Sequence, residues 1–173
     1  KPTPSRAIRT MTATGDTASF LDLVAGVESR GDYNAFNLGG SDGGHTAHGS
    51  GFTGAGAQRW GRELSEMTVG EVMEIGASPS SENRWVHAAG RYQIIPSTLR
   101  GLVQRYKIDR NAPFDEATQD QLAMYLAYQR LVQSNKINGL RNEWIGLNNV
   151  GAGQIEASLG AAFNNPQLLL KGV

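Results

Sequence analysis

Glu28 is the side chain whose type and position first suggest chemistry. The apolar residues before it recur at the spacing of one buried helical face: Phe20, Leu23, Val24 and Val27. Gly31 stops this helix soon after Glu28. An acid on the last turn of a mostly buried helix lies between core and solvent, where partial burial raises its pKa and suits it to general acid catalysis. The alternative is an ordinary solvated glutamate, because charged side chains are mostly exposed.

A second group of candidate ligands lies in the glycine-rich segment 39–56. His45 and His48, with Asp42 nearby, have side chains that bind metals. They lack a third strong ligand at helical spacing, so the pattern favours solvated loop histidines. We therefore expect no metal and no other cofactor.

Composition excludes several classes of protein. The 173 residues carry 16 basic and 16 acidic side chains, and this balance favours neither nucleic acid nor an anionic membrane surface as a partner. Apolar runs are far shorter than the roughly 18 residues that span a bilayer. Cysteine is absent, which excludes disulfides and thiol catalysis. We expect a monomer.

The chain is predicted to fold as one domain over residues 17–173. Residues 1–16 are polar and contain two prolines, so we expect a linker or a processed, poorly ordered N-terminus. The helix that carries Glu28 has candidate N-caps at Asp16, Thr17 and Ser19. Segment 39–56 is too rich in glycine for a continuous helix or a well-packed strand, and we expect a long loop.

Later segments are mainly helical. Thr68 and Glu71 have the spacing of a capping box, and a polar loop follows over 77–83. Aromatic and β-branched residues at 84–87 and 92–95 predict short extended segments around a turn at 88–91. Further helices are predicted from Pro96, over 115–133, around Trp144 and around Leu159. The sequence therefore predicts a mainly helical α+β domain with a small sheet.

Two motifs resemble those of the lysozyme superfamily and its lytic transglycosylases. Glu28-Ser29, followed by Gly31 and Tyr33-Asn34, resembles the catalytic-glutamate motif. Segment 89–98, Ala-Gly-Arg-Tyr-Gln-Ile-Ile-Pro-Ser-Thr, resembles the second motif. Ala-Gly-Arg-Tyr-Gln together with Phe20-Leu21-Asp22 is most similar to lambda-type phage endolysins, and segment 144–153 is similar to their C-terminal Trp-x-x-Leu and glycine-rich turn. The resemblance implies a lysozyme-like fold, with a small antiparallel sheet beside a helical lobe.

The resemblance also implies the site. Glu28 becomes the catalytic acid that cleaves the β-1,4 bond between N-acetylmuramic acid and N-acetylglucosamine in peptidoglycan. The residues that the resemblance implies to contact the substrate are Ser29, Gly90, Arg91, Tyr92, Gln93 and Asn148. For Tyr92 a packed aromatic, and for Arg91 simple solvation, are equal alternatives. The implied setting is the bacterial cell wall in the periplasm, reached by a phage-encoded protein that is released at lysis or carried in the virion.

A second acid separates two mechanisms. Hydrolysis by a muramidase commonly needs a second carboxylate, and the candidates are Asp32 and Asp42. Neither lies in a segment expected to be rigid. A lytic transglycosylase needs one glutamate only and forms a 1,6-anhydro-muramoyl end, so the sequence favours this reaction over hydrolysis. A third possibility is a non-catalytic wall-binding or structural virion module of the same fold.

Overall fold

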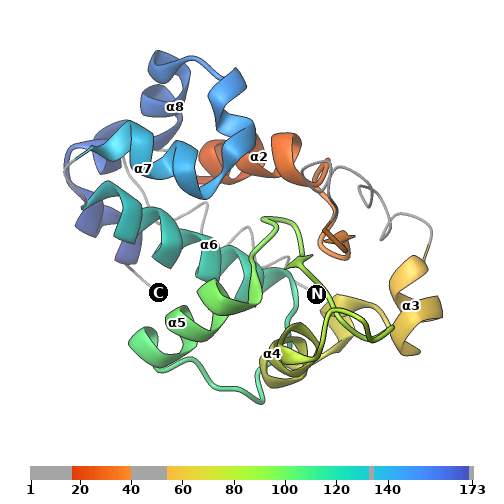
Figure 1. Ribbon diagram of the computed structural model, residues 1–173. Helices are drawn as coiled ribbons and strands as arrows, with labels where there is room; N and C mark the ends of the chain where they lie inside the picture. The colour runs from red at the N-terminus through yellow and green to blue at the C-terminus, as the bar shows by residue number, and fades with distance from the viewer. Residues whose placement is uncertain (1–16, 40–53, 133–134, 172–173) are drawn as a thin grey trace. The chain divides into compact units, whose positions relative to one another are not determined.

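The computed structural model describes residues 17–39, 54–132 and 135–171 (Figure 1). These residues are mainly helical and include one two-stranded antiparallel sheet, which confirms the predicted α+β class at that level. The expected linker over 1–16 lies outside the described residues, as do Asp42, His45 and His48. Within the described part of the chain, no helix has both the length and the apolar character needed to cross a membrane.

The elements follow one another in a simple order. The α-helices are α2 (Thr17–Glu28), α3 (Ala55–Trp60), α4 (Val69–Ala77), α5 (Pro96–Tyr106), α6 (Glu116–Leu131), α7 (Lys136–Glu143) and α8 (Ala152–Leu159). The strands are β1 (Phe36–Asn37) and β2 (Ala88–Ala89). Short 3-10 helices are η3 (Leu64–Glu66), η4 (Ile145–Asn149), η5 (Gly160–Phe163) and η6 (Pro166–Leu170).

Contacts divide the described chain into two compact units. The first unit combines residues 17–28 with 120–171, and the second comprises 29–119. One boundary therefore falls at the peptide bond between Glu28 and Ser29, and the other falls inside α6.

The first unit is built around α2, which contacts α8 and η4 (Figure 1). Phe20 of α2 is fully buried and meets the ring of Trp144 edge to face, with 5.8 Å between ring centroids. Aromatic pairs favour this geometry. Helix α6 supplies further core side chains, and its bounds lie within two residues of the predicted helix 115–133.

The predicted buried face of α2 is partly wrong. Leu21 and Ala25 are buried together with Phe20 and Val24, whereas Val27 is 37% exposed and Leu23 is only partly buried. The helix is apolar on most sides, so periodicity could not distinguish two neighbouring stripes. Glu28 lies three and seven residues after Ala25 and Leu21, so it continues the buried face instead of lying beside it.

In the second unit, α4 and α5 pack closely. A Cβ on Gly76 would lie 2.3 Å from Cγ of Pro96, so only glycine permits this approach. The predicted cap of α4 is confirmed, because Oγ1 of Thr68 accepts a hydrogen bond from the backbone N–H of Glu71 at 3.1 Å. Helix α5 begins with Pro96 at its first position, as predicted.

The predicted turn at 88–91 is wrong by two residues. Ala88 and Ala89 form β2, and Ala89 pairs with Phe36 of β1. The turn spans 90–93 instead, closed by two 3.0 Å hydrogen bonds that Ala89 and Ile94 exchange. Gly90 opens the turn with a φ of 82°, a conformation that glycine adopts without strain. The sheet partner of β2 is thus distant in the sequence. The extended segments predicted at 84–87 and 92–95 are wrong in part, because no strand covers 84–87 or 92–93.

The predicted loop over 39–56 is two residues too long at its C-terminal end, because residues 55–56 belong to helix α3. Helix α3 begins at Ala55, between Gly54 and Gly61, which take φ values of 73° and 78°. Glycines in the left-handed region start and stop this helix without lying in its middle. The carboxylate of Glu63 accepts a hydrogen bond from the N–H of Ala57 at 3.3 Å. Residues 40–53 lie outside the described part of the chain.

Candidate active site

Glu28 is the last residue of α2 and is partly buried in the first unit. Its Oε1 accepts a hydrogen bond from the backbone N–H of Gly146 in η4, at 3.2 Å. Burial raises the pKa of Glu28 above its ordinary value, the Gly146 hydrogen bond opposes this by favouring the carboxylate, and the charge of Glu143 raises it further. A carboxyl in this environment holds its proton to a higher pH than an exposed glutamate does.

Gly146 reaches Glu28 because it has no side chain. A Cβ at this position would lie 2.7 Å from Cβ of Val27, the residue before Glu28. The backbone of η4 can therefore lie directly against the last turn of α2. This contact brings the N–H of Gly146 to the carboxyl oxygen of Glu28, and the sequence did not identify Gly146 as part of the site.

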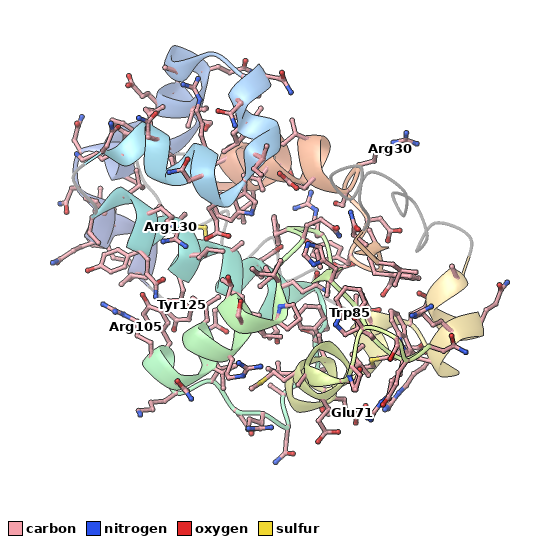
Figure 2. All side chains as sticks on the ribbon, in the orientation of Figure 1. Arg30, Glu71, Trp85, Arg105, Tyr125 and Arg130 are labelled. Carbon is pink, nitrogen blue, oxygen red and sulfur yellow. The ribbon has the colours of Figure 1, made fainter. Side chains whose placement is uncertain are left out.

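Glu143, at the end of α7, is a carboxylate that the sequence analysis missed. Arg130 projects from α6 (Figure 2) and donates from Nε and Nη2 to the same Oε1 of Glu143, at 2.9 and 2.5 Å. The side chain of Glu143 is 13% exposed. The ion pair holds Glu143 in one place while its charge acts on Glu28. The available signal was its position directly before Trp144, where the similar C-terminal segment begins.

We expect Glu143→Gln to lower the pKa of Glu28. The substitution removes one of the two factors that raise it, so Glu28 loses its proton at a lower pH. If protonated Glu28 is the acid, the decline of kcat/KM with rising pH should begin at lower pH than in wild type. A carbon-detected NMR titration of the Glu28 carboxyl reports the same shift without catalysis.

The exposed Glu156 on α8 supplies the matched control, and Glu156→Gln should leave the titration unchanged. An unaltered Glu28 titration in Glu143→Gln would contradict the role of that charge. Loss of activity at every pH would instead identify Glu143 as a second reacting carboxylate.

Of the two other candidate acids, the structure describes Asp32 but not Asp42. Asp32 lies in the second unit, and its Oδ1 accepts from the backbone N–H of Asn34 at 2.8 Å, as in an Asx-turn. Its Oδ2 is buried and has no hydrogen-bond partner among the described residues. Asp32 therefore belongs to the turn after α2. Asp42 lies outside the described residues.

Three predicted contact residues come together in the second unit. Ser29 Oγ donates to the carbonyl of Arg91 at 2.6 Å, which joins the residue after Glu28 to the turn 90–93. The Arg91 guanidinium lies 5.0 Å from the ring centroid of Tyr33 and 5.4 Å from that of Tyr92, and donates to the Tyr92 hydroxyl at 2.7 Å. Tyr92 is 1% exposed and packs in the core. This Arg91 cluster is held by cation–π and hydrogen-bond contacts.

Gln93 ends the turn in the left-handed region, with a φ of 48°. Its Nε2 donates to the carbonyl of Gly90 at 2.9 Å and to that of Ala35 at 3.4 Å. Its Oε1 has no hydrogen-bond partner in the described chain and is free to accept one. The amide is therefore fixed at its nitrogen and offers an acceptor, which suits an N–H or hydroxyl of a sugar.

Gln119, at the start of α6, was missed by the sequence analysis. It is 1% exposed, and its Oε1 accepts from the N–H of Arg91 at 2.9 Å. Its Nε2 donates to the carbonyls of Phe114 and Tyr33 at 2.8 and 3.1 Å. A Cβ on Gly90 would lie 2.2 Å from its Oε1, so glycine is required there by space as well as by φ. Gln119 thus holds the turn 90–93 in place.

Asn148 belongs to the first unit, whereas the other predicted contact residues belong to the second. It is exposed in η4, and its Nδ2 donates to the carbonyl of Ile145 at 2.9 Å. No group of three or more metal-binding side chains occurs among the described residues. The chain matches no protein-family model, no curated protein and no solved structure.

If the chain cleaves peptidoglycan, as the resemblance implies, we expect Gln93→Ala to slow the cleavage by about 10- to 1000-fold, the range for a loosened bound geometry. Gln93→Gly removes the same amide but relieves the strain of a positive φ. Similar losses in both variants, measured as kcat/KM, would show that the amide matters. Full activity in Gln93→Gly would assign the effect to the backbone, and Gln104→Ala on the exposed side of α5 serves as control.

Proposed function

We propose that this protein cleaves peptidoglycan as a lytic transglycosylase, with Glu28 as its single catalytic acid and a lysozyme-like fold. The observation that carries the proposal is the environment of Glu28. Its carboxyl is partly buried, has a raised pKa and receives one backbone hydrogen bond from Gly146. A general acid that works near neutral pH needs an environment that raises its pKa in this direction. The resemblance of the two motifs supports the same assignment.

In the proposed reaction, Glu28 gives its proton to the glycosidic oxygen as the C1–O bond breaks. The resulting carboxylate keeps the Gly146 hydrogen bond, which stabilises its charge. It then takes the proton of the C6 hydroxyl of the same muramoyl sugar, whose oxygen bonds to C1. The products are a 1,6-anhydro-muramoyl end and a free N-acetylglucosamine end, with Glu28 again protonated and no water consumed.

Among the described residues, the contacts of Asp32 and Glu143 favour one acid over two. Asp32 is engaged in its own turn, and Glu143 is paired with Arg130. The hydrolytic alternative, a muramidase, has support from the fact that Glu143 lies near enough to act electrostatically on Glu28. Inverting and retaining glycosidases both use such pairs of carboxylates.

Mass spectrometry of digested, purified cell walls tests the reaction. Transglycosylation gives anhydro ends, which are lighter by one water than the reducing ends left by hydrolysis. Anhydro ends as the main product would support the proposal, and reducing ends would establish the muramidase. Absence of any cleaved product would favour a wall-binding or structural virion module.

We further propose that peptidoglycan glycan strands are the partner of this chain, which acts as a monomer at the cell wall in the periplasm. A phage-encoded protein, free or carried in the virion, fits this role. Neither nucleic acid nor a membrane is part of the proposal.

A further inference from the structure

The second unit contains a pocket that the proposed chemistry does not use. It has a volume of about 380 Å³, within the usual range for small-ligand sites of about 300–1,000 Å³. Its lining comes from β1 and the residue after it, from α3, and from the loop before β2: Phe36, Leu38, Ala55, Gln58, Arg59 and Asn83. We call this the Arg59 pocket, after the one charged residue among its described lining residues.

Arg59 forms no ion pair with any residue in the part of the chain that the structure describes. Its Nη2 donates to the carbonyl of Trp85 at 3.0 Å, in the loop seen in Figure 2. Its Nε is buried and has no acceptor in the described chain, and no carboxylate there pairs with the guanidinium. Burial lowers the pKa of Arg59, which reflects the cost of removing the charge from water.

The surroundings hold Arg59 in place. Its guanidinium lies 5.7 Å from the ring centroid of Trp60. The ring centroids of Trp60 and Phe36 are 4.7 Å apart. Trp60 in turn donates from Nε1 to the carbonyl of Arg84 at 2.8 Å. Two side chains of α3 thus bind the loop 84–85. Because these contacts fix the guanidinium in advance, an anion would meet a donor that needs little reorganisation.

The remaining lining residues define the rest of the ligand. Gln58 and Asn83 are exposed, and their side-chain amides make no hydrogen bond with the described residues, so both offer donors and acceptors. Phe36, Leu38 and Ala55 provide an apolar surface. The guanidinium of Arg59 suits a carboxylate, and the amides of Gln58 and Asn83 suit the amides of a peptide. The apolar surface suits small apolar side chains.

We propose that the Arg59 pocket binds the free carboxylate of a short acylated peptide. If the proposed function holds, the peptide stems of peptidoglycan are the source of this peptide; the preference of the pocket for a carboxylate does not depend on that function. The guanidinium would bind the carboxylate through charge-assisted hydrogen bonds, which are stronger than neutral ones. A neutral glycan would leave the charge of Arg59 uncompensated and is the competing ligand.

Calorimetric titration of the full chain tests the proposal with three probes: acetyl-alanyl-alanine, its C-terminal carboxamide, and an N-acetylglucosamine oligomer. Tryptophan fluorescence gives a second readout, because Trp60 and Trp85 both contact Arg59. We expect saturable binding of the carboxylate peptide, and binding of the carboxamide at least about 10-fold weaker, as expected from the loss of a charged hydrogen bond.

Arg59→Gln should remove this preference, whereas Arg105→Gln should keep it, because Arg105 points away from α5 into solvent (Figure 2). Absence of binding, equal affinity for carboxylate and carboxamide, or an unchanged preference in Arg59→Gln would each overturn the proposal. The comparison of carboxylate and carboxamide peptides on the wild-type chain tests the proposal even if Arg59→Gln does not fold. Peptide binding without wall cleavage would refute the proposed function alone, and wall cleavage without peptide binding would refute this pocket alone.

Discussion

Glu28→Gln is expected to abolish cleavage of peptidoglycan. The amide keeps an oxygen that can accept the Gly146 hydrogen bond, so the local structure should persist, but it has no proton to give the leaving group. Loss of a general acid costs about 10²- to 10⁴-fold in rate, and Asp32 and Glu143 are each engaged in contacts of their own. Release of soluble fragments from purified walls measures the effect. More than about a tenth of the wild-type rate would refute the assignment.

Thermal unfolding across a pH range is the control for folding in Glu28→Gln. A carboxyl with a raised pKa binds its proton more tightly in the folded state, so its contribution to stability is complete at low pH and is lost as pH rises through the folded pKa. Glutamine has no charge at any pH. The variant should therefore match wild type below about pH 4 and have the higher melting temperature near neutrality. The reverse order at neutral pH would contradict the raised pKa.

Gln119→Leu is expected to produce the largest loss of stability. Leucine has a similar size but removes all three hydrogen bonds of the Gln119 amide: the one from Arg91 in the turn 90–93, and those to the carbonyls of Phe114 and Tyr33. Each buried group left without a partner costs about 1–3 kcal/mol. A total of about 3 kcal/mol or more corresponds to a melting temperature about 6–12 °C lower for a chain of this size.

Gln104→Leu is the matched control, because Gln104 is exposed on α5 and the chemical change is the same. It should leave the melting temperature within about 2 °C of wild type. A small effect of Gln119→Leu, equal to that of the control, would show that the turn does not depend on the buried amide.

The helices were largely predictable because local signals mark their ends. Pro96 fixes the start of α5, Thr68 caps α4, and the apolar pattern of α6 extends over four turns. The buried face of α2 was less predictable, since Leu21 and Val27 are equally apolar and only tertiary contacts decide between them. The pairing of β1 with β2 could not be predicted, because two alanines have low strand propensity and their partner is about fifty residues away.

The candidate site, too, could be predicted from the sequence only in part. The burial and raised pKa of Glu28 follow from its position at the end of an apolar helix. Gly146 and Glu143 lie more than a hundred residues further along the chain, and no spacing rule connects them to Glu28. Gln119 has the residue type of a solvent-facing helix position, and only the structure shows its buried hydrogen bonds.

The hydrogen bond from Gly146 has one more consequence for the acid. Its donor is a peptide N–H, which cannot gain or lose a proton over any pH at which the protein is folded, unlike a histidine or lysine partner. Side-chain substitutions elsewhere cannot remove that donor either; at position 146 itself, proline would eliminate it. Glu28 is therefore paired with a donor whose charge does not change with pH, so this hydrogen bond favours the carboxylate equally at every pH at which the protein is folded.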